Sequence, residues 1–304
     1  MLSQALQDYL ALRRGLGFKL VDTEELLRSF VSFADEHDDI VLRAETGVAW
    51  ARQGASVRRQ YRRLRTLALF AEHLRAEDLC HESMPTHLFN SAPPLRHPPR
   101  IFSLEEIEQV LAKTAELRPL DSIRPITHRT LIGLIFTTGM RISEALKLRI
   151  EDVNASGITI RETKFCKSRW LPLHPSAVEA LDAYLVARHA LATDSDRLFL
   201  SQRRQPFARD RVLKTFQALC AGAGIAGAGA RRKPRLHDLR HSFAVHALRR
   251  CGAERDVVER HMLALSTYMG HVSVASTYWY LEQTPELMRD IATACDAAQS
   301  GGVA

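Results

Sequence analysis

The chain has 304 residues, of which 46% are hydrophobic and 25% charged, and its 42 Lys and Arg against 35 Asp and Glu give a formal net charge of +7. No apolar run approaches the roughly 20 residues of a membrane-spanning helix, and five scattered cysteines without a C-x-x-C pair favour free thiols in a reducing cytoplasm. These features argue against a membrane protein, a secreted disulfide scaffold and a disordered chain. The excess of positive charge favours, weakly, a polyanionic partner.

The charge divides the chain into two parts. Residues 1–92 include 12 basic and 13 acidic residues, whereas residues 93–304 include 30 basic and 22 acidic residues. Between them, residues 85–100 contain five prolines, and proline is excluded from helix interiors and central strands because it lacks an amide donor and has a fixed φ. We therefore expect two domains, 1–92 and 93–304, joined by an extended linker.

The first part of the chain has the apolar spacing of amphipathic helices. Gly15 and Gly17 end the first of them. The apolar positions recur three or four residues apart in three groups: Leu2, Leu6, Tyr9 and Leu10; Leu26, Leu27, Phe30 and Phe33; Leu64, Leu67, Leu69, Phe70 and Leu74. We expect this domain to be all-helical.

A helix expected over residues 56–75 begins with a cluster of arginines. They are Arg58, Arg59, Arg62, Arg63 and Arg65, and they precede the apolar stripe of that helix. The simpler interpretation is a solvated helix face. We favour a face that contacts phosphates, because arginines without a nearby acid repel one another unless an anion binds them.

The second part of the chain mixes helices and short strands. Ser103, with Glu106 three residues later, predicts a capped helix start, and an apolar helix is expected over about 129–136. Gly157–Ile160 and residues 170–173 are rich in β-branched and aromatic residues and predict a hairpin. Residues 198–200 are a candidate third strand, and helices dominate again after residue 208. The fold class predicted is mainly α with a small antiparallel β-sheet, that is, a helical N-terminal domain and a mixed α+β second domain.

Ten basic and only two acidic residues lie between positions 203 and 240. The members that we select as phosphate-binding candidates are Arg203, Arg204, Arg231, Arg232 and Lys233. The run leads into His237 and Arg240, which share one face of a helix because they are three residues apart. Arginine binds phosphate with two parallel hydrogen bonds and histidine exchanges a proton near neutral pH, although an H-x-x-R pair alone is a weak signal.

A second candidate arginine lies in the sequence T-G-M-R-I-S-E. Gly139 permits a tight turn into a new helix, with Arg141 in its first turn and Glu144 on the same face. An intrahelical ion pair is the simplest interpretation. An arginine near a helix start opposes the helix dipole, however, which argues mildly against a purely structural role.

Taken in order, these motifs resemble the tyrosine recombinases, the lambda-integrase-like or phage integrase family. The family's first arginine lies in T-G-x-R-x-S-E, as Arg141 does, and its H-x-x-R corresponds to His237 and Arg240. Its hairpin lysine corresponds to Lys164 in residues 163–173, with Lys167 as the alternative. The histidine of its G-H pair corresponds to His271, and its nucleophile, which follows nine residues later, corresponds to Tyr280. The resemblance covers 93–304, and the ending T-Y-W-Y-L-E looks more like integrases carried by mobile elements.

The resemblance implies a metal-independent cleavage of DNA without a cofactor. Tyr280 would attack the phosphorus and form a covalent 3′-phosphotyrosine, with Tyr278 as the competing candidate. Arg141 and Arg240 would bind the negative charge of the transition state. His237 would accept a proton and Lys164 would protonate the leaving 5′-oxygen. His271 would donate a hydrogen bond to the phosphate, and Glu144 would orient neighbouring side chains. No H-E-x-x-H or paired C-x-x-C is present, so no metal site is expected.

Three functions remain open at this stage. The first is a site-specific recombinase or integrase that acts on double-stranded DNA as a synaptic homotetramer. The second is a type IB topoisomerase and the third is a non-catalytic DNA-binding protein. An amphipathic stretch over 286–297 favours the first, because such a tail could dock into a neighbouring protomer. A bacterial cytoplasmic location at the nucleoid and no membrane partner are expected.

Overall fold

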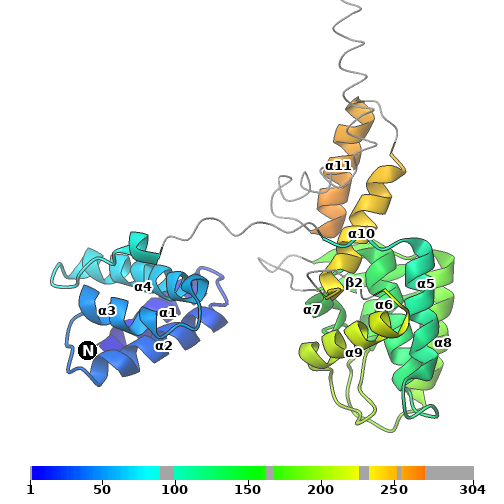
Figure 1. Ribbon diagram of the computed structural model, residues 1–304, viewed down its shortest axis with the longest axis horizontal. Helices are drawn as coiled ribbons and strands as arrows, with labels where there is room; N and C mark the ends of the chain where they lie inside the picture. Colours follow the sequence, from blue (N-terminus) through cyan, green and yellow to red (C-terminus); the bar gives the residue numbers. More distant parts are fainter. Residues whose placement is uncertain (1, 90–98, 162–167, 226–232, 252–254, 271–304) are drawn as a thin grey trace, which may run out of the picture. The chain divides into compact units, whose positions relative to one another are not determined.

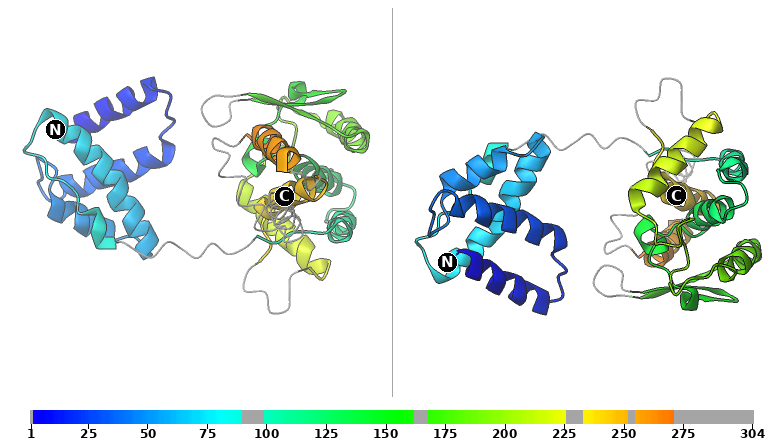
Figure 2. Two further views of the ribbon diagram at one scale, coloured as in Figure 1. Left: turned by 90° about the horizontal axis from the view of Figure 1, so that it is seen from above. Right: turned by 90° about the horizontal axis from the view of Figure 1, so that it is seen from below.

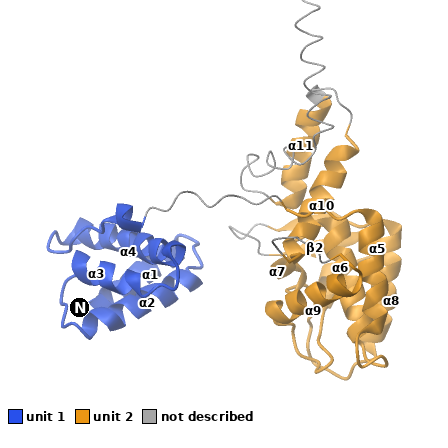
Figure 3. Ribbon diagram, viewed as in Figure 1, with its two compact units in different colours: residues 1–96 blue, residues 97–304 orange. Residues whose placement is uncertain are grey.

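The computed structural model describes residues 2–89, 99–161, 168–225, 233–251 and 255–270. The chain forms two compact units, residues 1–96 and 97–304 (Figure 3). Across the described ranges, no helix is both long enough and apolar enough to cross a membrane. The all-helical first unit and the mainly helical second unit with one small sheet confirm the predicted fold class.

The helices of the first unit pack against one another (Figure 1), and their apolar side chains form one core. Its elements are α1 (Leu2–Gly15), α2 (Val21–Asp35), α3 (Ala44–Arg52), α4 (Val57–Glu77) and the 3₁₀ turn η1 (Thr86–Phe89). The apolar positions predicted for α1 are buried, and Trp50 of α3 lies in the centre with no exposed surface. The prediction was wrong for Leu69 on α4, which is 52% exposed because it lies off the stripe that Leu67 and Phe70 bury.

The proline-rich stretch is not extended from its start. Met84 is buried in the core of the first unit, and η1 contacts α4. Phe89 is partly buried against the same core. The prediction of a linker beginning at Pro85 was therefore wrong for its first residues, because a buried Met84 and Phe89 hold the chain against α4. Residues 90–98 lie outside the described residues.

The second unit is built around the apolar helix α6 (Arg124–Thr138), which contacts the later helices α8 (Pro175–His189) and α10 (Leu236–Arg249). The other elements are α5 (Leu104–Lys113), η2 (Thr114–Glu116), α7 (Ile142–Ala145), η3 (Ile150–Asp152), α9 (Arg209–Gly222) and α11 (Arg255–Met269). The predicted capping box at Ser103 and Glu106 is present, and it starts α5. Helix α6 extends beyond the expected 129–136 at both ends.

A three-stranded antiparallel sheet lies at one edge of the second unit (Figure 2). Strands β2 (Gly157–Ile160) and β3 (Arg169–Pro172) form the predicted hairpin, in a register that pairs Ile160 with Arg169. The third strand is β1 (Val153–Asn154), so the prediction of a strand at 198–200 was wrong. Residues 198–200 are almost fully buried, and the backbone pairing around them consists of isolated bridges, Arg149 with Arg197 and Leu200 with Pro206, and not of a ladder.

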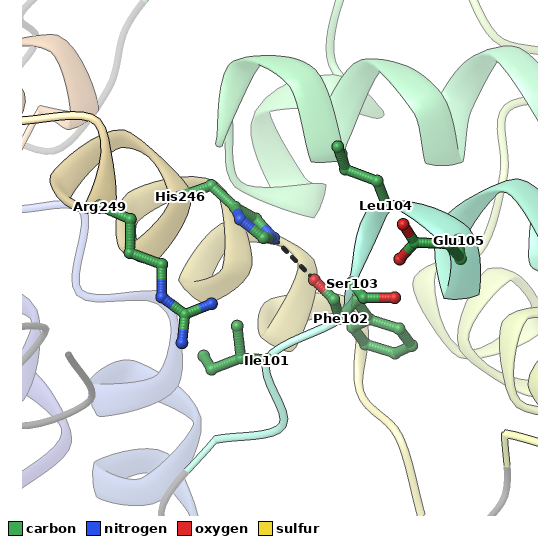
Figure 4. A pocket seen from close by; sticks show the side chains of 7 residues that line it. All are labelled: Ile101, Phe102, Ser103, Leu104, Glu105, His246 and Arg249. Atoms are coloured by element: carbon green, nitrogen blue, oxygen red, sulfur yellow. Dashed lines mark hydrogen bonds between the residues drawn. The ribbon is translucent and has the colours of Figure 1, made fainter. Parts of the chain in front are cut away.

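Helices α10 and α11 contact each other and share a small apolar core of their own. The middle and the last part of α10 also hold Phe102, which lies just before α5. Ser242 Oγ accepts from the Phe102 backbone amide at 2.8 Å, and His246 Nε2 lies 2.8 Å from the Phe102 carbonyl oxygen (Figure 4). His237 and Arg240 lie in the first two turns of the same helix.

Candidate active site

Arg240 lies in the interior of the second unit, 1% exposed. Its Nη1 donates to the Gly139 carbonyl at 2.6 Å and its Nη2 to the Met269 carbonyl at 2.8 Å. Gly139 ends α6 with φ of +62°, and a Cβ there would come within 2.4 Å of the Phe243 ring, so only glycine fits this turn. One guanidinium group thus ties together the ends of α6 and α11 and the start of α10.

Arg141 is the residue immediately before α7, with extended backbone, rather than a member of its first turn as predicted. Its Nη1 donates to Glu144 Oε1 at 2.8 Å, and its Nη2 donates to the Gly270 carbonyl at 3.2 Å. About a third of the side chain, 34%, remains exposed. Arg141 and Arg240 therefore hold two successive carbonyls at the end of α11, those of Met269 and Gly270.

Glu144 is the acid that orients this cluster. Its side chain is 9% exposed and accepts hydrogen bonds from the Arg141 backbone amide, from Arg141 Nη1 and from both terminal nitrogens of Arg169. Burial raises the pKa of a carboxyl, but hydrogen bonds from Arg169 and Arg141 outweigh it and lower the pKa of Glu144 to about 2. The carboxylate is therefore ionised at every physiological pH.

Arg169, on β3, is a site residue that sequence reasoning missed. Its side chain is 13% exposed, and it donates to Glu144 Oε2 at 2.7 Å and to Glu144 Oε1 at 3.2 Å. The available signal was strand alternation: Arg169 lies on the same face as the buried Leu171, so its charge had to find a partner inside the unit. Gly270 has φ of +66°, and a Cβ there would lie 2.9 Å from Arg169 Nη1.

His237 is in the first turn of α10 and is exposed on the surface of the unit. Its ring packs edge-on against His241 with centroids 4.5 Å apart. Crowding by surrounding protein atoms, and then the positive charges of Arg240 and Arg235, lower the pKa of His237 to about 4. The His237 imidazole is therefore uncharged at neutral pH.

Several predicted residues lie outside the described residues. They are Lys164 and its alternative Lys167, Arg231, Arg232, His271, Tyr280 and its competitor Tyr278, and the tail over 286–297. Among the other candidates, Arg203, Arg204 and Lys233 are exposed. Arg204 donates to the Ala192 carbonyl at 3.0 Å, which fastens the turn that it occupies. Lys233 precedes α10 at the same end as His237.

In the first unit, Arg58, Arg59, Arg62 and Arg65 are all exposed on α4. The premise that no acid lies near them was wrong, because Arg62 Nη2 lies 2.7 Å from Asp22 Oδ2 of α2. Arg63 turns inward, and its guanidinium lies 4.1 Å from the centre of the Trp50 ring. The face therefore has one local ion pair, and Arg58, Arg59 and Arg65 extend along the same helix surface.

A pocket of about 340 Å³ lies at the start of α5, lined by residues of 101–105 and by His246 and Arg249 (Figure 4). It contains none of the motif residues, so the arginine cluster and not this pocket is the candidate active site. Within the described ranges, no three His, Cys, Asp or Glu side chains come together as a metal site would require.

The model of the phage integrase family matches residues 100–286, which is the stretch that carries all the catalytic motifs. The chain therefore belongs to the phage integrase family, whose members are tyrosine recombinases that perform site-specific DNA recombination. It is 37% identical to the protein named integrase/recombinase y4rB of Sinorhizobium fredii, over 94% of both chains. It is 31% identical to tyrosine recombinase XerD of Rhizobium meliloti, over 79% of this chain and 75% of that protein.

The fold is also that of solved structures. A lambda integrase tetramer bound to a Holliday junction aligns with a TM-score of 0.60 at 17% identity, over 92% of this chain and 76% of that chain. At 17% identity, this similarity shows that the two chains share a fold.

Proposed function

We propose that this recombinase cuts and rejoins DNA strands through a 3′-phosphotyrosine formed by Tyr280. Arg141 and Arg240 bind the non-bridging oxygens of the scissile phosphate, where negative charge grows in the transition state. His237 accepts a proton, Lys164 protonates the leaving 5′-oxygen, His271 donates a hydrogen bond to the phosphate, and Glu144 orients Arg141. The energy of the cut bond is kept in the enzyme–DNA ester, so no cofactor is needed.

One observation carries this proposal. Two guanidinium groups from different elements, Arg141 before α7 and Arg240 on α10, are fixed by the successive carbonyls of Gly270 and Met269. The other terminal nitrogen of each is also held, that of Arg240 by the Gly139 carbonyl and that of Arg141 by Glu144. A fixed pair of arginine forks is the arrangement that a pentacoordinate phosphorane requires, because it supplies positive charge without reorganisation. The next residue in the chain is His271, and Tyr280 follows nine residues later.

We propose that double-stranded DNA is bound by both units. Support comes from the exposed arginines of α4, namely Arg58, Arg59, Arg62 and Arg65, and from Arg203, Arg204 and Lys233 in the second unit. Arg231 and Arg232 belong to the same basic stretch of sequence. In this proposal residues 1–92 are a core-binding DNA-binding domain and residues 93–304 the catalytic domain.

We further propose that the working form is a synaptic homotetramer on DNA, with the tail over 286–297 exchanged between protomers. A related fold forms a tetramer on a Holliday junction, and the tail sequence is amphipathic. The name integrase/recombinase of one relative supports a function in DNA integration, and the ending T-Y-W-Y-L-E supports an integrase of a mobile element. The setting would be the nucleoid in the bacterial cytoplasm.

The proposal is tested by trapping the covalent intermediate. DNA linked to the protein in cells is sequenced to obtain the target, and a labelled duplex of that sequence is then incubated with protein and denatured in detergent. Tyr280→Phe should abolish the DNA-linked band and leave binding nearly intact, whereas Tyr278→Phe should retain the band. A band that persists in Tyr280→Phe and disappears in Tyr278→Phe would overturn the nucleophile assignment.

A topoisomerase of type IB is the second candidate, because it uses the same tyrosine and the same clamp of arginines. The two functions can be distinguished by assays with plasmid substrates. A recombinase produces recombinant circles from a plasmid with paired target sites, whereas a topoisomerase relaxes any supercoiled plasmid without paired sites. Relaxation alone, with no recombinants at any protein concentration, would favour the topoisomerase.

A further inference from the structure

Arg169 has a set of contacts that the assigned roles do not use. It lies on β3, is 13% exposed, and binds the Glu144 carboxylate with both terminal nitrogens, at 2.7 and 3.2 Å. A guanidinium group that donates two parallel hydrogen bonds to a carboxylate fixes the relative orientation of the two groups and also neutralises charge. The strand that carries the pair also leads out of the segment that contains Lys164.

The charges around Glu144 do not cancel one another. Glu144 carries one negative charge and Arg141 and Arg169 one positive charge each, which leaves a net charge of +1 on the three groups. The oxygens are shared: Oε1 accepts from Arg141 Nη1 and Arg169 Nη1, and Oε2 accepts from Arg169 Nη2 and the Arg141 backbone amide. Without Arg169, the carboxylate would face Arg141 alone and would neutralise it.

The same guanidinium group supports the end of α11. A Cβ built on Gly270 would lie 2.9 Å from Arg169 Nη1 and 3.2 Å from its Cζ, so the guanidinium lies directly against this glycine. Arg141 Nη2 holds the carbonyl of the same residue at 3.2 Å. Gly270 is therefore enclosed between the two arginines that Glu144 joins, and it is the residue from which the chain continues to His271.

We propose that Arg169 is a positioning residue for cleavage. It takes up the negative charge of Glu144, so that Glu144 can orient Arg141 without cancelling the positive charge that Arg141 offers to the phosphate, and it supports Gly270 at the exit of α11. The inference rests on the proposed function, in which Arg141 binds the scissile phosphate. It assigns to Arg169 a function in the reaction without any contact with the DNA.

The test is a charge-balance cycle with Arg169→Gln, Glu144→Gln and the double variant in the full chain. Rates of covalent adduct formation are measured at saturating labelled duplex, so that binding differences do not enter. Arg169→Gln should slow adduct formation about 100-fold, because Glu144 then neutralises Arg141. The double variant should be at least about tenfold faster than Arg169→Gln, because removal of the acid returns the charge of Arg141. Arg161→Gln is the matched control, since Arg161 pairs with Asp152 beside the same hairpin at 2.5 Å, and its rate should match that of the wild type.

Each outcome tests either the positioning function of Arg169 or the proposed function of the protein. A double variant no faster than Arg169→Gln would mean that Arg169 only supports the fold, and the inference would be overturned. An Arg169→Gln rate equal to that of the wild type would overturn it as well. If Arg169→Gln does not fold, as judged by circular dichroism, Arg169→Lys replaces it. This variant keeps the positive charge opposite Glu144, so its rate of adduct formation should stay within about tenfold of the wild-type rate. A larger reduction of that rate, in a variant that is folded, contradicts the charge argument. A wild-type chain that forms no adduct refutes the proposed function instead.

Discussion

The arginines of α4 and the arginines of the active site differ in what holds their guanidinium groups. On α4, Arg62 pairs with Asp22 across two largely exposed side chains, 60% and 75% exposed. Such a pair contributes between zero and about 1 kcal/mol and is screened by salt. In the active site, Arg240 is 1% exposed and bound to two backbone carbonyls, and Arg169 is bound to a buried carboxylate.

The difference shows two ways of presenting positive charge to a polyanion. Exposed arginines adapt to a phosphate backbone and lose side-chain entropy when they bind. Arginines held by fixed acceptors have already lost that entropy on folding, so they suit a transition state whose geometry does not vary. Variants of the two groups should therefore differ in the size of their effects.

The largest effect is expected for Arg240→Lys compared with Arg58→Lys. Lysine keeps the charge but cannot hold the Gly139 and Met269 carbonyls while it offers a fork to phosphate. Arg240→Lys should lower the rate of adduct formation by about 10³-fold, and Arg58→Lys should leave it within about twofold. Single-turnover cleavage of the labelled duplex measures both. Equal rates in the two variants would remove the distinction between fixed and adaptable arginines.

A second expectation concerns the pH dependence of stability. The folded-state pKa of Glu144, about 2, lies below that of an unfolded glutamate, so its contribution is present above about pH 4.5 and is lost as pH falls towards 2. The amount is about 3 kcal/mol for a shift of that size. Denaturant unfolding at several pH values should show a steeper loss of free energy of unfolding in wild type than in Glu144→Gln. Parallel curves for the two proteins would contradict the assignment of a tightly bound carboxylate.

A smaller effect is expected for the triple variant Arg58→Ala, Arg62→Ala and Arg65→Ala. Removal of one arginine–phosphate interaction reduces the slope of log affinity against log salt by about one unit, so the slope should flatten by up to about three units. The choice of bases should not change, because interactions with phosphates carry no sequence information. Fluorescence anisotropy over a salt series measures the slope. An unchanged affinity and slope would mean that the α4 face is only solvated.

The smallest effect is expected when divalent ions are removed. Arg141 and Arg240 supply the positive charge that a metal would otherwise supply at the phosphate. Adduct formation in excess EDTA should therefore stay within about twofold of the rate without chelator. Strict dependence of cleavage on an added divalent ion would show that the two arginines are not sufficient.

Much of the site was predictable because its residues lie in short, ordered motifs. Arg141 with Glu144, and His237 with Arg240, each fall within one turn of chain, and local spacing alone brings their side chains together. The hairpin and the capping box at Ser103 were predicted for the same reason. Arg169 was not identified as a site residue, because its partner Glu144 lies 25 residues earlier in the chain and on another element.

The sequence by itself determined the family, the order of the motifs and the mainly helical class, because periodicity, capping and turn chemistry act over a few neighbouring residues. Only the tertiary structure decided that α10 carries Arg240 to the carbonyls of Gly139 and Met269, 101 and 29 residues away. It also decided that Arg169, Glu144 and Arg141 form one network and that Asp22 reaches Arg62. Buried charge needs a partner, but which partner it finds depends on how distant elements pack, and packing is a property of the whole fold.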